Sequence, residues 1–184
     1  MKYPGVKTRV DVVNGGAEKY KTIATFIENT TSSIMITFLR TNSDNADFRS
    51  LVVLLDQDLA IRDGEDHAFY DQFNKIVNIQ HVVVCYDDTK PIACGAFKAY
   101  DADTVEIKRM FVVPELRGHG LGGKVLKELE LWALEEGFAA CVLETGKKQP
   151  EAIALYTRSG YNITPNYGQY ENVANSVCMK KEID

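Results

Sequence analysis

Four glycines lie within six positions of the segment RGHGLGGK, residues 117–124. Gly118, Gly120 and Gly123 have the G-x-G-x-x-G spacing of dinucleotide-binding loops, and an acidic residue, Glu144, follows roughly 20 positions later, as that fingerprint requires. Glycine lets the backbone approach an anion closely, and a helix that begins after the loop adds partial positive charge. The segment therefore predicts a phosphate-binding loop, and a nicotinamide or flavin enzyme is the first hypothesis.

The surroundings of the loop argue against a dinucleotide fold. That fold needs a strand that runs straight into the first glycine, in a parallel sheet with further β-α units after the acidic residue. Here residues 114–117 separate the preceding strand from Gly118, the earlier strands are linked by short turns, and only 40 residues follow Glu144. The backbone N–H groups of residues 118–123 can instead bind a different pyrophosphate, with Arg117 as a cation at the rim.

The hydrophobic pattern around the loop predicts strands and helices in alternation. Period-two alternation over residues 81–113, broken by two polar turns, predicts a three-stranded antiparallel meander. Apolar residues at helical spacing from Leu121 predict a helix that ends at Gly137, and a second, shorter helix ends at Gly160. Three further strands are predicted over residues 139–144, 161–163 and 176–183.

A strand and a long helix are predicted before the meander. Residues 33–40 form a short apolar run typical of a buried strand. Between Phe48 and Leu59, apolar residues recur at helical spacing, which predicts a helix capped by Ser43 or Asp44 that ends near Gly64.

The first 32 residues predict a separate extension. Residues 9–13 alternate loosely before the turn signal Asn-Gly-Gly at positions 14–16, and apolar residues between Tyr20 and Ile27 recur at helical spacing. We therefore divide the chain into an N-terminal strand-helix extension packed on the domain, residues 1–32, and the main domain, residues 33–184.

Composition limits the classes of function. The chain has 184 residues and a formal net charge of -5, without a basic stripe interleaved with aromatic residues, so we expect no nucleic acid partner. The four cysteines lack C-x-x-C or metal-ligand spacing, which predicts buried free thiols and no metal site. The first 16 residues have no apolar core of signal-peptide length, and no run of 18 apolar residues occurs, so we expect neither a signal peptide nor a membrane span. We expect a cytoplasmic protein without a membrane partner, acting as a monomer or homodimer.

The glycine loop and a later helix together resemble a known family. The segment VVPELRGHGLGGKVL resembles the acetyl-coenzyme A pyrophosphate loop of the GNAT superfamily of N-acetyltransferases, and the helix carries the family's second signature, A-x-x-L-Y followed by G-F/Y. One departure is Gln149, where many members carry asparagine. The likeness covers residues 33–184. The residues that match the two signatures are Arg117, Gly120, Gly122, Ala152, Leu155, Tyr156, Gly160 and Tyr161.

The resemblance implies a GNAT-like fold, with a central mixed, mostly antiparallel, splayed sheet flanked by helices. It also implies acetyl-CoA as co-substrate and no metal. In this family the pantetheine arm lies between two diverging strands and bonds to strand backbone. The coenzyme-binding residues that the resemblance implies are Met110, Phe111, Val112, Val113, Arg117, Gly118, His119, Gly120, Leu121, Gly122, Gly123 and Gln149.

Two residues are implied as catalytic. Glu106 lies where the family often carries a catalytic glutamate, and it would take the proton of an acceptor amine whose reference pKa is near 10.4. The alternative is a strand-face carboxylate paired with Lys108 or Lys98. Tyr156 matches the family's usual general acid and would stabilise the leaving thiolate by a hydrogen bond. The alternative for Tyr156 is a core tyrosine on an amphipathic helix.

Two segments are candidates for the wall of the acceptor site. Residues 62–74 are acidic and aromatic, and residues 165–176 are unusually rich in tyrosine for a loop. Their alternatives are a solvated helix cap and a dimer contact. The acceptor residues that we expect are Glu65, His67, Tyr70 and Tyr170.

The leading hypothesis is an N-acetyltransferase that moves an acetyl group from acetyl-CoA to a primary amine by direct attack. The acceptor, either a small amine or a protein lysine, stays open. One alternative is a non-catalytic acyl-CoA-binding module on the same fold, and the other is the dinucleotide oxidoreductase.

Overall fold

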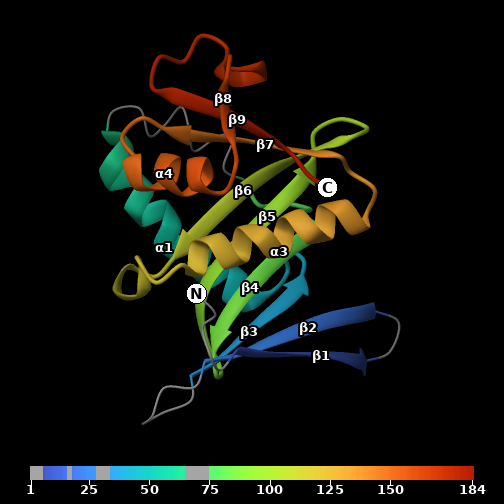
Figure 1. Ribbon diagram of the computed structural model, residues 1–184. Coiled ribbons are helices and arrows are strands. Elements are labelled where there is room, and N and C mark those ends of the chain that lie inside the picture. Colours follow the sequence, from blue (N-terminus) through green and yellow to red (C-terminus); the bar gives the residue numbers. More distant parts are fainter. Residues whose placement is uncertain (1–5, 16–17, 28–33, 65–74) are drawn as a thin grey trace.

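The computed structural model describes residues 6–15, 18–27, 34–64 and 75–184, which form one sheet with helices on both faces (Figure 1). The nine strands have the order β1-β2-β3-β4-β5-β6-β7-β9-β8, and β6–β7 is the one parallel pair among them. The strands are β1 Val6–Gly15, β2 Glu18–Ile27, β3 Ile34–Thr41, β4 His81–Asp87, β5 Lys90–Ala99, β6 Thr104–Val112, β7 Ala140–Gly146, β8 Asn162–Thr164 and β9 Ser176–Glu182. The α-helices are α1 Ala46–Asp63, α3 Leu121–Glu135 and α4 Pro150–Arg158, and the short 3-10 turns are Pro114–Leu116 and Gly168–Tyr170. The predicted mixed, mostly antiparallel sheet flanked by helices is confirmed.

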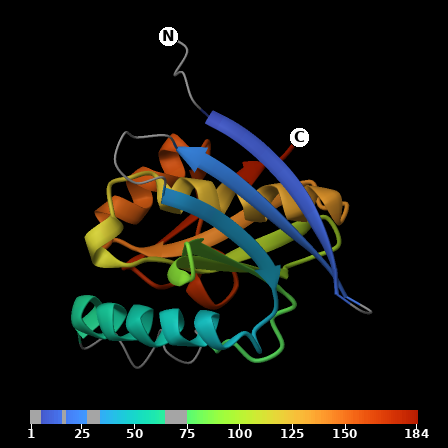
Figure 2. The ribbon, with the colours of Figure 1, turned by 90° about the horizontal axis from the view of Figure 1, so that it is seen from below.

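The helix predicted between Tyr20 and Ile27 is wrong. This segment is β2, which pairs with β1 from Val6↔Ile27 to Gly15↔Glu18 and also with β3. Four of the six residues 22–27 are β-branched, which favours a strand, and β1 and β3 both offer backbone partners to these residues. The hairpin of β1 and β2 therefore continues the sheet of the main domain (Figure 2). The division of the chain at residue 32 stays a prediction.

Helices cover the two faces of the sheet unequally. Helix α1 lies on one face, and α3 and α4 lie on the other (Figure 2). Helix α1 begins at Asn45, whose Oδ1 accepts a hydrogen bond from the Phe48 amide at 2.8 Å, so Asn45 is the cap rather than Ser43 or Asp44. It ends at Gly64, as predicted. Of the helices described, none is long and apolar enough to cross a membrane.

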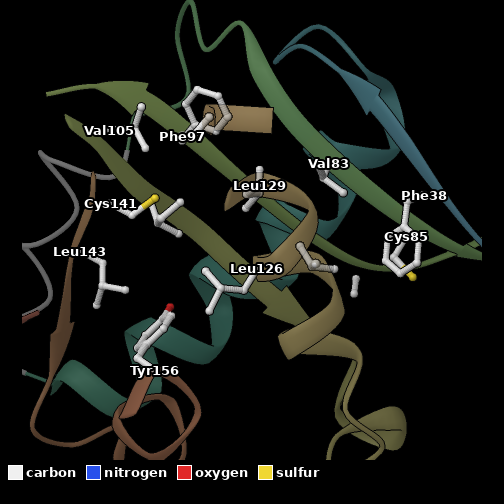
Figure 3. Packing of buried hydrophobic residues seen from close by; sticks show 14 of the residues in the cluster. Phe38, Val83, Cys85, Phe97, Val105, Leu126, Leu129, Cys141, Leu143 and Tyr156 are labelled. Atoms are coloured by element: carbon white, nitrogen blue, oxygen red, sulfur yellow. The ribbon is translucent and has the colours of Figure 1, made fainter. Parts of the chain in front are cut away.

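The core lies mainly between the sheet and α3. Leu126 and Leu129 of α3 are fully buried against strand residues such as Phe97, and Tyr156 of α4 closes one end of the same cluster (Figure 3). This packing fixes α3, and with it the glycine loop at its N-terminus, relative to β6 and β7.

Strand β6 contains a β-bulge near the centre of the sheet. Lys108 pairs with Ala96 and Phe111 with Cys94, so Arg109 and Met110 together oppose Gly95. Arg109 has a positive φ of 58°. A Cβ atom on Gly95 would lie 2.8 Å from a methyl group of Leu129 and closer still to the Met110 sulfur, so glycine is required there.

Just before the bulge, β6 and β7 separate. Their parallel pairing runs from Thr104↔Ala140 to Ile107↔Leu143 and then ends, although both strands continue. The two diverging strands that the family resemblance implies are therefore β6 and β7. After Ile107, the backbone of β6 therefore pairs with none of the described strands on its β7 side.

Candidate active site

A cavity of about 90 Å³ occupies the gap between the diverging strands. Residues 107–110 of β6 form one wall, residues 144–146 of β7 form another, and Leu55 and Leu59 of α1 close one face. Tyr156 and Gln149 complete the lining. The splayed sheet thus opens a narrow slot beside the backbone of β6.

A larger cavity of about 490 Å³ adjoins this gap at the glycine loop. The two cavities share Leu55, Met110, Gln149 and Tyr156, so they form one groove. Ten of the twelve residues expected to bind the coenzyme line the groove: Met110, Phe111, Val112, Arg117, Gly118, Gly120, Leu121, Gly122, Gly123 and Gln149.

The other two expected coenzyme residues lie differently. Val113 donates its amide hydrogen to the Ile92 carbonyl at 3.0 Å, so this amide already has an acceptor in the sheet. The His119 side chain is exposed, and its Nδ1 lies 3.0 Å from the Arg117 carbonyl oxygen. Neither side chain is among the described residues that line the groove.

The glycine loop has a conformation that favours glycine. Gly118 and Gly120 have φ values of 81° and 78°, in the left-handed region, and a Cβ atom on either would project into open space. Helix α3 begins at Leu121, and the N–H groups of a first helical turn have no partner within the helix. These donors and the helix dipole form an anion site that faces the larger cavity.

Arg117 is held at the rim of the groove. Its Nε donates to the Val112 carbonyl at 3.0 Å, and its Nη2 lies 3.1 Å from Asp58 of α1. The guanidinium also lies over the Phe111 ring, 5.6 Å from its centre. These contacts fix the Arg117 guanidinium at the rim and connect α1 to the glycine loop.

Tyr156 lies where the core and the groove meet, and its role in the reaction stays a prediction. Its side chain is 6% exposed and belongs to the core, yet it lines both cavities. Burial raises the pKa of Tyr156, and the nearby charge of Glu144 raises it further. The phenol therefore stays protonated at neutral pH and can donate a hydrogen bond into the gap.

Glu106 forms an ion pair with Lys108, as the alternative to a catalytic role predicted. The Lys108 ammonium lies 2.9 Å from the Glu106 carboxylate, and both side chains are largely buried. The other candidate partner, Lys98, donates to the Val77 carbonyl instead, at 3.3 Å. Among the described residues that line the two cavities, Glu106 is absent.

Glu144 is a candidate that sequence reasoning missed, because it was considered only as part of a dinucleotide fingerprint. It lines the gap cavity beside Tyr156 and pairs in register with Cys178 of β9. The alternation of side chains along β7 could have revealed it. Cys141 and Leu143 are apolar and belong to the core on the α3 side, so every second residue of β7 faces that core. Glu144 therefore lies on the opposite face, at the end of the strand where the gap opens.

The acceptor wall is only partly described. Glu65, His67 and Tyr70 lie outside the described residues. Tyr170 is buried, 4% exposed, and its ring packs edge-on against Tyr167 with centres 6.0 Å apart. Burial raises the pKa of Tyr170, and the Glu144 and Glu106 carboxylates also raise it.

The cysteines fit the predicted packing role. All four are free and buried, and burial raises the pKa of the Cys94 and Cys141 thiols to about 12. Thiols in that state are poor nucleophiles at neutral pH. Within the described ranges, no group of three metal-ligating side chains is present.

Comparison with known proteins gives consistent matches. Residues 48–161 match the acetyltransferase (GNAT) family. The chain is similar to the IAA acetyltransferase of Azospirillum brasilense, with 37% identity over 94 residues that cover 50% of this chain and 61% of that protein. The matched part thus spans less than two thirds of the length of that relative.

Solved structures show the same fold. A crystal structure from Klebsiella pneumoniae, of a protein assigned as an acyl-CoA N-acyltransferase, is 27% identical with a TM-score of 0.68 and covers 81% of this chain and 98% of that one. A GNAT family acetyltransferase of Elizabethkingia anophelis, crystallised with acetyl-CoA bound, is 19% identical with a TM-score of 0.60 and covers 80% of this chain and 98% of that one. At that identity the second likeness concerns the fold alone.

Proposed function

Because this chain belongs to the acetyltransferase (GNAT) family, we propose that it transfers the acetyl group of acetyl-CoA to a primary amine by direct attack. The observation that carries this proposal is the groove, in which the anion site of the glycine loop continues into the gap between β6 and β7 and meets Tyr156. A long substrate with a pyrophosphate at one end and a thioester at the other fits this arrangement.

The groove supplies the groups that coenzyme A needs. The N–H groups of the loop and of the first turn of α3 would donate to the pyrophosphate oxygens, and Gly118 and Gly120 leave room for that approach. The backbone of β6 beyond Ile107 would bond to the pantetheine arm, because none of the strands in the described ranges pairs with it on the β7 side. The thioester would then lie near Tyr156 in the gap.

The reaction needs a neutral amine and a stabilised thiolate. The amine nitrogen attacks the thioester carbonyl carbon, the carbon–sulfur bond breaks, and the sulfur leaves with the bonding electrons. The Tyr156 hydroxyl, kept protonated by its raised pKa, would donate a hydrogen bond to that sulfur. The proton lost by the amine passes to a carboxylate and then to water.

We assign the proton acceptor to Glu144 ahead of Glu106. Glu144 lines the gap cavity together with Tyr156, whereas Glu106, which pairs with the Lys108 ammonium, is not among the described residues that line either cavity. A base must lie within hydrogen-bond reach of the amine, or one water away. Glu106 would then position the amine rather than deprotonate it.

Two measurements test the proposal. Acetyl-CoA should raise the thermal unfolding temperature whereas NADH should not, because binding to the native state alone stabilises it. Release of free thiol from acetyl-CoA should then depend on an added primary amine. Stabilisation by acetyl-CoA without thiol release for any amine would favour the non-catalytic acyl-CoA-binding module.

The dinucleotide oxidoreductase does not fit this fold. A dinucleotide fold needs a mostly parallel, doubly wound sheet, and β6–β7 is the single parallel pair within the described ranges. The four buried free thiols suit the reducing cytoplasm that we expect for this protein. Whether it acts as a monomer or a homodimer stays a prediction.

A further inference from the structure

Arg109 lies in the bulge of β6 and has an uncommon backbone conformation. Its φ of 58° lies in the left-handed region, which residues other than glycine seldom adopt. Residues held in such conformations cluster at functional sites, where the surrounding structure stabilises the strained backbone. The Arg109 carbonyl oxygen accepts a hydrogen bond from the Cys94 thiol at 3.6 Å, which ties the bulge to β5. Arg109 is therefore a candidate for a role in the active site.

The bulge brings the Arg109 side chain to the α1 face of the sheet. Lys108 pairs in register with Ala96, which belongs to the core cluster under α1, so Lys108 lies on that face. In a regular strand the next side chain would point to the opposite face. Arg109 instead forms an ion pair with Asp56 of α1. Two consecutive cationic residues thus lie on one face, and both line the gap cavity.

One donor of the Arg109 guanidinium has no acceptor. The side chain is 2% exposed, and its Nη2 donates to Asp56. Its Nε is buried, and none of the residues that the structure describes accepts a hydrogen bond from it. Because Asp56 already balances the charge, Nε lacks a hydrogen-bond acceptor rather than a counter-ion. A buried donor without an acceptor destabilises a native protein, and a ligand oxygen in the cavity would remove that cost.

The cavities limit which part of the coenzyme can supply this oxygen. Arg109 and Tyr156 both line the gap cavity of about 90 Å³. Tyr156 also lines the larger cavity at the glycine loop, but Arg109 is not among the described residues there. The pyrophosphate would lie in that larger cavity, so the thioester end is the part that reaches Arg109. If the sulfur lies beside the Tyr156 hydroxyl, its carbonyl group occupies the same small space.

We propose that Nε of Arg109 donates a hydrogen bond to the carbonyl oxygen of the acetyl thioester. The inference rests on the proposed function and adds a residue to its chemistry. As the amine nitrogen bonds to the carbonyl carbon, the π electrons of the carbonyl move to this oxygen, which gains negative charge. When the carbon–sulfur bond breaks, the carbonyl forms again and the thiolate leaves. Arg109 transfers no proton and stabilises the oxygen while it is charged.

Two substitutions separate the Nε–H donor from the positive charge. Arg109→Lys keeps a cation for Asp56 but places a methylene group where Nε lies. Arg109→Gln places an amide nitrogen at that position of the side chain and removes the charge. Isothermal titration measures binding of acetyl-CoA and of CoA without any amine, and thiol release with an accepted amine gives kcat.

Arg109→Lys should bind acetyl-CoA about tenfold more weakly, because the hydrogen bond to the thioester carbonyl is lost. Its affinity for CoA, which lacks that carbonyl, should change less than twofold. Its kcat should fall about a hundredfold, as expected when one donor to a developing oxyanion is removed. Arg109→Gln should retain more of both the acetyl-CoA affinity and kcat than Arg109→Lys. An ion pair with a purely structural role predicts the reverse order.

Arg40→Lys is the matched control. Arg40 is also a buried arginine in an ion pair, with Glu128 at 2.7 Å, and it is not among the described residues that line either cavity. Thermal unfolding reports the stability of all three variants. Arg40→Lys should lose stability and keep both affinities and kcat within twofold of the unsubstituted protein.

Three results would overturn the inference. Equal weakening of acetyl-CoA and CoA binding in Arg109→Lys would indicate a contact with the pantetheine arm instead. Higher acetyl-CoA affinity and kcat in Arg109→Lys than in Arg109→Gln would leave only the ion pair. If Arg109→Lys does not fold, Arg109→Gln decides alone, and a selective tenfold loss of its acetyl-CoA affinity would exclude the Nε donor. Thiol release with no amine would refute the proposed function, whereas the binding comparison would still test the contact with the carbonyl.

Discussion

Replacing Gly120 by alanine should separate coenzyme binding from folding. Gly120 has a φ of 78°, and a Cβ atom there would meet no atom within 4 Å, so the substitution causes backbone strain without a clash. A left-handed conformation costs an L-residue about 1–2 kcal/mol. For a chain of this length, we expect a fall in unfolding temperature of about 2–8 °C.

The loss of coenzyme affinity should exceed this general effect. The loop presents N–H donors to a charged pyrophosphate, and each hydrogen bond to a charged group contributes about 1.5–3 kcal/mol. Displacing one donor, or placing a Cβ atom where a phosphate oxygen approaches, should weaken binding of coenzyme A about tenfold to a hundredfold. Isothermal titration of the folded variant measures this change directly.

Gly137→Ala is the matched control. Gly137 follows α3 with a φ of 91°, and a Cβ atom there also meets nothing within 4 Å, but the residue is remote from the loop in the sequence and does not line the groove. It should lose similar stability and keep its coenzyme affinity. Equal affinity of Gly120→Ala and the unsubstituted protein would refute the assignment of the loop, and equal weakening in both variants would indicate a global effect.

Further substitutions test the chemistry and the bulge. Tyr156→Phe should keep coenzyme affinity and lower kcat by about a hundredfold, since one transition-state hydrogen bond is lost; full turnover, where chemistry limits the rate, would contradict its role. Glu144→Gln should show a kcat/KM deficit that shrinks as pH rises, because more acceptor is already neutral, while Glu106→Gln should lose the same fraction at every pH. If instead the deficit of Glu106→Gln shrinks with pH and that of Glu144→Gln does not, Glu106 is the base. Gly95→Ala should lower the free energy of unfolding in urea by about 1–3 kcal/mol, because its Cβ atom would lie 2.8 Å from Leu129, and unchanged stability would show that the bulge can relax.

The sequence by itself determined the local features of this protein. The glycines at 118, 120, 137 and 160 all have positive φ, as expected for a phosphate loop and for helix ends. Hydrophobic periodicity gave the meander and the three helices, and the spacing of the loop and the Tyr156 helix predicted the family. Each of these signals lies within a few neighbouring residues. Local backbone conformation and the period of side chains along a helix or strand depend on such short segments, so the sequence alone reveals them.

The tertiary structure decided everything that depends on which strands are neighbours. Residues 20–27 have a helical spacing, but pairing with β1 and β3 makes them a strand. Glu144 faces the gap because the pairing of β7 with β6 ends at Leu143 while β7 continues. Contacts between residues far apart in the sequence leave no periodic trace along the chain, so only the folded sheet reveals them.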